Sequence, residues 1–212
     1  MAAALSTDEI ARELAACEVT LPAPALEKLS LYLELLLHWN RRINLTGLRD
    51  PRVIVRRLFG ASLYLARLIE LRGWLVDVGS GAGFPGLALK LATPDLKVTL
   101  LEPRKRKAAF LKEVIREGGF TITEVVVDRF ETWAGRINNG QVAIITTRGV
   151  GLSAALLSRM AETLSPAGTV AVFTSLKIAQ SLLTREEALS WHEPSAIPGQ
   201  GGSVVLIGSL KN

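Results

Sequence analysis

From residue 74 onward, short apolar runs alternate with longer stretches in which apolar positions recur at a helical period. The short runs predict strands over Leu75–Val78, Val98–Leu101, Thr123–Val127, Val142–Ile145, Thr169–Phe173, Leu189–His192 and Val204–Ile207. Between them the pattern predicts helices over Gly86–Leu91, Arg104–Glu117, Leu152–Leu164 and Ile178–Glu187. Alternating strands and helices form a parallel sheet that is covered on both faces. We therefore expect an α/β fold with a mostly parallel, seven-stranded sheet.

The first 72 residues show only helical patterns. Ser6 and Glu9 have the spacing of a capping box, which predicts a short first helix. Leucines between Leu26 and Leu37 recur on one face of a second helix, and Pro51 is suited to the first turn of a third that runs to about Arg72. We therefore divide the chain into an N-terminal helical extension, residues 1–72, and an α/β domain, residues 73–212.

The first predicted strand of the α/β domain leads directly into a glycine-rich turn. The segment from Leu75 to Gly86 is Leu-Val-Asp-Val-Gly-Ser-Gly-Ala-Gly-Phe-Pro-Gly. Glycines let a ligand approach the backbone and permit positive φ angles. The helix that follows directs free N–H groups and a partial positive charge back at the turn. This arrangement predicts a binding site for a nucleotide-like cofactor at the end of the strand.

Two cofactor classes fit the glycine spacing, and Asp77 distinguishes them. Gly81, Gly83 and Gly86 satisfy G-x-G-x-x-G, which is typical of dinucleotide sites. The same segment satisfies acid-x-G-x-G-x-G, which resembles motif I of Rossmann-like methyltransferases that use S-adenosylmethionine. A carboxylate at Asp77 would repel a pyrophosphate but attract the ammonium group of that cofactor. Glu102, at the end of the next strand, is placed to bind ribose hydroxyls in either class. We favour S-adenosylmethionine.

The charge of the chain is unevenly distributed. The net charge is +5, and eight arginines lie between Arg41 and Arg72 against two acidic residues. A second basic cluster spans Arg104–Lys107. Arginine forms bidentate contacts with phosphates, so these clusters favour a polyanionic partner such as RNA, although a solvated basic face remains an alternative.

Other features narrow the class of protein. Cys17 is the single cysteine, and with His38 and His192 it gives no metal-ligand spacing, so we expect neither disulfides nor a metal site. No run approaches the roughly 20 apolar residues of a membrane span. The first residues also lack the pattern of a signal peptide. We therefore expect a cytoplasmic protein without a membrane partner, and a monomer.

Several segments together resemble the bacterial RsmG family, also called GidB, over about residues 26–164. They are Trp39-Asn40, Ile43–Thr46, Arg49–Pro51, Val76–Gly86, Arg129–Glu131 and Thr147–Gly149. The resemblance implies a Rossmann-like fold and S-adenosylmethionine-dependent methylation of N7 of a guanine in 16S ribosomal RNA, with the RNA or the small ribosomal subunit as partner.

The resemblance also assigns roles to individual residues. The cofactor would contact the strand-end acids, the glycine turn and later positions: Asp77, Gly79, Ser80, Gly81, Gly83, Phe84, Glu102, Phe130, Glu131 and Arg148. Arg148 would contact the cofactor or lie beside the guanine, and is the candidate catalytic residue. The candidate substrate-binding residues are Asn44, Thr46 and Arg57.

The chain departs from the family pattern at several positions. Leu58 and Ala61 stand where the family has a histidine and an acid, Ala143 replaces another acid, and Thr174 lies in an altered segment. We expect these departures to lie on the side that meets RNA. They keep open a second hypothesis, a ribosome-associated relative with impaired activity. An NAD(P)-dependent oxidoreductase and a methyltransferase for proteins or small molecules are further alternatives.

Overall fold

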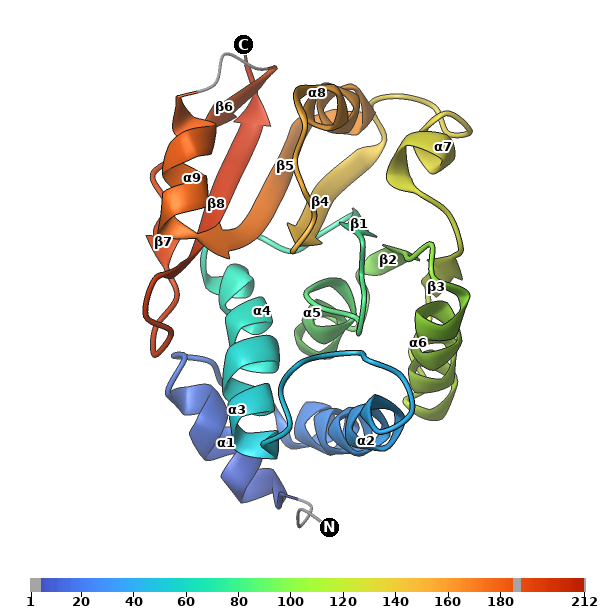
Figure 1. Ribbon diagram of the computed structural model, residues 1–212, viewed down its shortest axis with the longest axis vertical. Helices are drawn as coiled ribbons and strands as arrows, with labels where there is room; N and C mark the ends of the chain where they lie inside the picture. Colours follow the sequence, from blue (N-terminus) through green and yellow to red (C-terminus); the bar gives the residue numbers. More distant parts are fainter. Residues whose placement is uncertain (1–4, 185–187, 212) are drawn as a thin grey trace.

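The computed structural model describes residues 5–184 and 188–211 (Figure 1). The first four residues, on which the expectation of no signal peptide partly rests, lie outside this range. So do residues 185–187, the end of the helix expected to reach Glu187. No helix of the described part has the length and apolar character needed to cross a membrane.

A single mixed sheet forms the centre of the molecule. Its strands are β1 (Trp74–Val78), β2 (Lys97–Leu101), β3 (Thr123–Val126), β4 (Val142–Arg148), β5 (Leu164–Ser175), β6 (Leu189–Trp191), β7 (Ser195–Ala196) and β8 (Ser203–Leu210). The order is β3-β2-β1-β4-β5-β8-β6, with β7 also paired to β8. β1 to β5 are parallel, whereas β8 runs antiparallel to β5. The α/β fold is confirmed.

The expected number of strands was too low by one in the described part of the chain. The additional strand, β7, has two residues, and Ala196 pairs with Val204 of β8. Such a short pairing forms where the chain folds back on itself before β8. Two residues are too few to show an alternation of apolar and polar positions, so the strand could not be recognised in the sequence.

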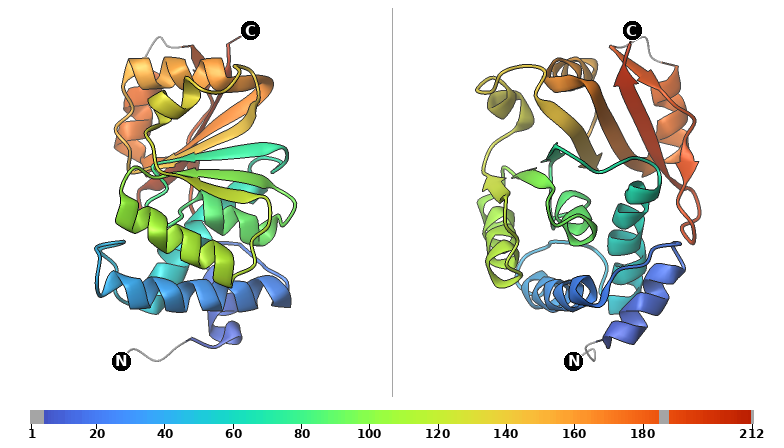
Figure 2. Two further views of the ribbon diagram at one scale, coloured as in Figure 1. Left: turned by 90° about the vertical axis from the view of Figure 1, so that its right-hand side faces the viewer. Right: turned by 180° about the vertical axis from the view of Figure 1, so that it is seen from behind.

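Helices cover both faces of the sheet, as the edge-on view shows (Figure 2). One face packs against α7 (Phe130–Ala134), α8 (Ala154–Thr163) and α9 (Leu176–Leu183). The other packs against α5 (Gly86–Ala92), α6 (Lys105–Glu117) and the N-terminal helices α1 (Thr7–Ala15) and α2 (Ala23–Asn40). Neighbouring residues alternate between the two cores, so that Leu75 faces the second group of helices and Val76 the first. The first 72 residues thus share one hydrophobic core with the sheet.

The helix expected from Pro51 to about Arg72 is shorter and irregular. It comprises α3 (Pro51–Ile54), a π-helical segment η1 (Val55–Gly60), α4 (Ala61–Leu63) and a 3₁₀ turn η2 (Tyr64–Arg67). The last turn tightens because the chain must reverse before β1 begins at Trp74. In the π-helical segment, the backbone carbonyls of Arg56 and Arg57 accept hydrogen bonds from Gln200 and Arg148, at 2.7 and 2.9 Å. Only tertiary structure supplies these two donors.

Candidate active site

Most of the predicted site residues lie where the parallel strands end, around three adjoining cavities. The glycine-turn cavity, about 390 Å³, is lined by Leu45, Thr46, Leu58, Gly79–Ala82, Phe84, Glu102–Arg104, Lys107, Arg148 and Gly149. The Phe130 cavity, about 250 Å³, shares Gly79 and Pro103 with it. A third cavity of about 540 Å³, the β4–β5 recess, shares Arg148 and Gly149 with the first. Ligands of open parallel sheets bind at this edge.

The glycine turn has a conformation that glycine alone adopts readily. Gly79, Gly81 and Gly83 have φ angles of 70°, 58° and 90°. At Gly83 an added Cβ would also lie 2.1 Å from the hydroxyl oxygen of Tyr32, and at Gly79 it would lie 2.6 Å from Cγ2 of Val150. The turn is therefore closely packed by other elements.

Tyr32 of α2 supports the glycine turn, a role that the sequence analysis missed. Its hydroxyl donates a hydrogen bond to the backbone carbonyl of Ala82, and its ring stacks on Phe84 with centroids 5.6 Å apart. Phe84 is 5% exposed yet lines the glycine-turn cavity. The sequence feature that could have predicted this role is a tyrosine on the leucine-rich face of a helix, because a buried hydroxyl needs a hydrogen-bond partner.

Glu102 follows β2 and connects the glycine turn with α6. One carboxylate oxygen accepts the Gly81 N–H and the other the Arg104 N–H, both at 2.9 Å. The side chain is largely buried but lines the cavity beside Arg104 and Lys107. A carboxylate at this helix start compensates the cations of the first turn of α6. Each oxygen retains a lone pair for a further donor, such as a hydroxyl.

Asp77 lies beneath the glycine turn. It is fully buried and is absent from the linings of the three cavities. Its Oδ1 accepts a hydrogen bond from the Thr146 hydroxyl at 2.8 Å, whereas Oδ2 is buried without a partner. Burial raises the pKa of Asp77 to about 6, although the bond from Thr146 opposes this rise. An added Cβ at Gly86 would lie 2.5 Å from that of Asp77, so the start of α5 presses directly on this acid.

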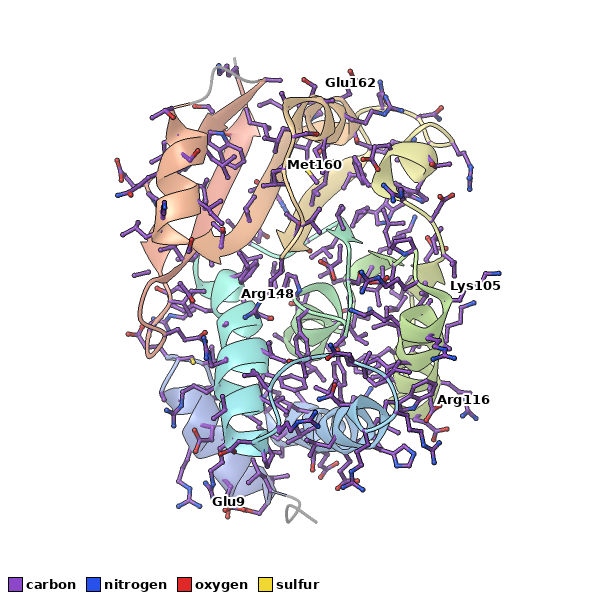
Figure 3. All side chains as sticks on the ribbon, viewed as in Figure 1. Glu9, Lys105, Arg116, Arg148, Met160 and Glu162 are labelled. Carbon is purple, nitrogen blue, oxygen red and sulfur yellow. The ribbon has the colours of Figure 1, made fainter. Side chains whose placement is uncertain are left out.

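Arg148, at the end of β4, lies between the glycine-turn cavity and the β4–β5 recess. Its Nη2 donates to the Arg57 carbonyl at 2.9 Å, and its Nη1 is buried without a partner. It forms no ion pair within residues 5–184 and 188–211. Burial and then the charge of Arg57 lower the pKa of Arg148 to about 10. Figure 3 shows the side chain in the middle of the molecule, between the sheet and the helical segment drawn in cyan. A buried cation with a free donor at a cavity favours an anionic or carbonyl-bearing ligand.

The remaining expected cofactor residues lie along the same edge. Phe130 and Glu131 begin α7 and line the Phe130 cavity together with Asp128. Phe130 is buried, whereas Glu131 is exposed. Asp128 forms an ion pair with Arg136 at 2.5 Å, which holds the loop before α7. Ser80 donates a hydrogen bond from its hydroxyl to the Asp77 carbonyl at 3.0 Å and lines the glycine-turn cavity.

The three expected substrate residues are placed differently. Thr46 lines the glycine-turn cavity, whereas Asn44 is exposed and lines none of the three cavities. Arg57 is exposed and touches the site through its carbonyl, which Arg148 contacts. Asn40 holds the loop in place, because its Oδ1 accepts the N–H groups of Leu45 and Thr46 at 3.0 Å. In the sequence, Asn40 stands out only as part of the Trp39-Asn40 pair, which does not indicate this role.

The departures from the family pattern, all expected on the side that meets RNA, do not share one side of the molecule. Leu58 lines the glycine-turn cavity beside Glu102. Ala143 lies at the opposite end of the sheet, where its Cβ is 2.9 Å from an added Cβ at Gly73. Thr174 lines the β4–β5 recess. A linear motif does not reveal which end of a strand or which face of a helix a position occupies.

Comparison with known proteins identifies the family. A profile described as GidB, rRNA small subunit methyltransferase G, matches residues 25–202. The chain belongs to the GidB family. It is 38% identical over 193 residues to ribosomal RNA small subunit methyltransferase G of Halorhodospira halophila, covering 89% of this chain and 90% of that protein. The protein of the same name from Sorangium cellulosum is 37% identical, covering 81% and 73%.

Solved structures support the fold of this GidB member. A SAM-dependent methyltransferase from Aquifex aeolicus superposes with a TM-score of 0.60 at 14% identity, covering 76% of this chain and 94% of that one. At such low identity the likeness concerns the fold alone. The GidB chain thus has the architecture of SAM-dependent methyltransferases, with the glycine turn at the end of β1.

Proposed function

We propose that this GidB member transfers a methyl group from S-adenosylmethionine to N7 of a guanine in 16S rRNA, the RNA of the small ribosomal subunit. One observation carries the proposal: the glycine turn, Glu102 and Arg148, whose buried Nη1 has no partner, meet at one sheet edge, around adjoining cavities. Family membership supports the reaction and the substrate class. We infer that the protein acts as a monomer in the cytoplasm.

The residues at this edge fit S-adenosylmethionine. Glu102 keeps lone pairs for the two ribose hydroxyls, and the bare backbone of Gly79 and Gly81 admits close approach. Phe130 and Glu131 would border the adenine in the neighbouring cavity. Arg148 offers a free Nη1 for a carboxylate or a base-edge oxygen. Because Asp77 is fully buried, we propose that it attracts the ammonium group from beneath the turn.

Methyl transfer to guanine N7 requires little acid–base chemistry from the residues of the chain. S-adenosylmethionine supplies a methyl group on a sulfonium centre. Guanine N7 carries a lone pair in its neutral form, so no residue has to remove a proton before attack. The residues therefore contribute mainly by holding the reacting atoms in line, which can lower the barrier by about 7–11 kcal/mol. Arg148 must contact an acceptor other than N7, because N7 becomes cationic.

The decisive test is methyl transfer to small-subunit RNA. Ribosomal RNA and small subunits from cells lacking this protein would be incubated with radiolabelled S-adenosylmethionine, and the methylated position mapped by mass spectrometry. We expect one labelled 7-methylguanine, also missing from the RNA of the deleted cells. Binding of the cofactor without labelling of either substrate would indicate the impaired relative. Calorimetric titration that detected NAD but not S-adenosylmethionine would indicate an oxidoreductase.

A further inference from the structure

Gln200 lies in the tight turn between β7 and β8 and lines none of the three cavities. The backbone of this turn bonds to itself: the Gln200 N–H donates to the Ile197 carbonyl at 3.2 Å, and the Gln200 carbonyl accepts the Ser203 N–H at 3.1 Å. Gln200 is only 8% exposed. A buried amide needs hydrogen-bond partners, so the contacts of this side chain show where the turn is held.

The Gln200 amide fastens the turn to a segment that lies 144 positions earlier in the chain. Its Nε2 donates to the Arg56 carbonyl at 2.7 Å and to the sulfur of Cys17 at 3.9 Å. The Cys17 thiol donates to the same carbonyl at 3.4 Å. At Gly199 an added Cβ would lie 3.0 Å from the Ala16 carbonyl oxygen, so the turn also packs closely on the end of α1. Gln200 therefore anchors the π-helical segment η1 to the turn before β8.

The anchored segment forms part of the active-site wall, where Leu58 lines the glycine-turn cavity. The Phe59 ring meets the ring of Phe84 edge to face, with centroids 4.8 Å apart. The Arg57 carbonyl accepts the hydrogen bond from Nη2 of Arg148 at 2.9 Å. π-Helical turns interrupt the regular helical ladder and are frequent at functional sites. The position of η1 therefore decides how several groups of the site are placed.

Gln200 and Arg148 bind neighbouring carbonyls of this segment. Gln200 donates to the Arg56 carbonyl, and Arg148 donates to the Arg57 carbonyl. Peptide groups are planar, so only the two backbone dihedral angles at Arg57 separate these carbonyls. Because Nη1 of Arg148 is buried without a partner, the bond from Nη2 largely sets the direction of the guanidinium. A shift of the Arg56 carbonyl would therefore be passed on to Arg148.

We propose that Gln200 is a positioning residue for methyl transfer: it holds the Arg56 carbonyl and so keeps η1 in the conformation in which the next carbonyl orients Arg148. This inference rests on the proposed methyl transfer, in which Arg148 is the candidate catalytic residue. Gln200 acts through η1 and contacts neither cofactor nor RNA. A misplacement of about 1 Å that originates far from the reacting atoms can slow an enzyme by about 100-fold, so the loss of one anchor has a measurable effect.

Three single variants separate this role from a general contribution to folding. Gln200→Met keeps the length of the side chain and removes its amide donors. Ser62→Ala is the matched control, because the Ser62 hydroxyl also donates to a carbonyl of η1, that of Leu58, at 2.5 Å. That bond lies within one continuous helical segment and anchors it to no other part of the protein. Arg148→Met tests the route, because the effect of Gln200→Met can be measured with and without the guanidinium.

The first measurement is single-turnover methyl transfer to small-subunit RNA, per folded molecule of the whole chain. We expect Gln200→Met to slow transfer by about tenfold and Ser62→Ala to stay within about twofold of wild type. In the Arg148→Met background, Gln200→Met should change the rate by no more than about twofold, because residues that act through one another are not additive. If Gln200→Met melts below the assay temperature, Gln200→Asn, which retracts the amide by one methylene, takes its place.

The second measurement needs no RNA. The side-chain NMR signal of the Arg148 guanidinium, identified by its loss in Arg148→Met, reports how this group is held. We expect Gln200→Met to shift or broaden the signal, because the guanidinium loses its fixed direction. Ser62→Ala should leave the signal in place.

The outcomes separate this inference from the proposed function. An undiminished slowing by Gln200→Met in the Arg148→Met background would overturn the inference, because Gln200 would then act on the reaction by another route. A wild-type rate in Gln200→Met, or an Arg148 signal that does not change, would overturn it as well, and each of these results leaves the methyltransferase intact. Absence of RNA labelling by the wild-type protein would end the proposed function and this inference together.

Discussion

Two pairs of arginines differ in whether a carboxylate neutralises them. Arg52, Arg56 and Arg57 lie on the helical segment before β1, and Arg148 ends β4. Arg52 and Arg56 face α1, where they form ion pairs with Glu9 and Glu13. Arg56 approaches Glu13 to 2.6 Å, and the Glu13 side chain is only 10% exposed. Arg148 lines two of the cavities instead, whereas Arg57 is exposed and reaches the site only through its backbone carbonyl. Neither arginine forms an ion pair in the part of the chain that the structure describes.

The difference shows that a basic stretch of sequence serves two purposes. The pairs on α1 fasten the first helix to the core and are neutralised within the protein (Figure 3 shows Glu9 at the far end of the molecule from the sheet). Arg57 and Arg148 have no carboxylate partner in the described part of the chain, so their charges are available to bind an anion from outside the protein. Four of the eight arginines between Arg41 and Arg72 have carboxylate partners, so fewer of them than the sequence indicates are free of a partner within the chain.

The largest effect is expected at Arg148. Arg148→Met should reduce single-turnover methyl transfer by about 100-fold or more, as removal of a preorganised donor does in other enzymes. The melting temperature should be unchanged or higher, because a buried cation without a carboxylate partner costs free energy of folding. Radiolabel transfer and calorimetry measure the two quantities. If Arg148→Met lost stability but kept full activity per folded molecule, Arg148 would serve the fold, as the paired arginines do, and not the reaction.

Asp77, the other buried charge without a full set of partners, should make cofactor affinity depend on pH. The ionised carboxylate attracts the ammonium group, so affinity for S-adenosylmethionine should rise as the pH increases through about 6. Asp77→Asn should weaken binding by about tenfold at pH 7.5 and abolish this dependence. Titration calorimetry from pH 5 to 8 checks both, with the exposed Asp95→Asn as control.

The same pKa has a consequence for stability with a defined sign. The folded pKa of Asp77, about 6, lies above the ordinary value of 3.8, so the folded state binds the proton more tightly. This group therefore lowers stability progressively as the pH rises from about 4 to about 6. The melting temperature of Asp77→Asn relative to wild type should increase over that window. A constant difference would show that burial does not raise this pKa.

A smaller effect is expected at Arg57. Arg57→Gln should weaken RNA binding a few-fold and reduce the slope of log affinity against log salt concentration by about one, the signature of one lost phosphate contact. Arg72→Gln is the matched control, because Arg72 is exposed and paired with Glu70 at 3.3 Å. Filter binding at several salt concentrations measures the slope. Equal slopes for both variants would remove Arg57 from the RNA surface.

The smallest effect on activity is expected at Arg56. Arg56→Met leaves Glu13 largely buried with only the longer contact to Arg52, at 3.5 Å, so stability should fall by about 1 kcal/mol. For a chain of this size that corresponds to a decrease of about 2–4 °C in melting temperature. Methyl transfer per folded molecule should match wild type. A marked loss of activity would show that the paired arginines also serve the reaction.

Local signals predicted much of this architecture. Ser6 and Glu9 form the expected capping box, and β1, β2 and α6 begin and end within a residue of the expected positions. The brief strand β7 and the short helix α7 were missed, because elements of two and five residues carry too little periodicity. The irregular end of the third helix was also missed, because its carbonyls bond to donors that are distant in the sequence.

The sequence alone determined the alternation of strands and helices, the glycine turn and the acids that end β1 and β2, because each depends on residues close together in the chain. Tertiary structure alone decided that Tyr32 supports the turn, that Asp77 is buried beneath it and that Arg148 lacks a carboxylate. The physical reason is that burial and charge pairing depend on which distant segments meet. Arg56 and Arg57 are adjacent in the sequence, yet one is neutralised and the other is not, because they lie on different faces of one helical turn.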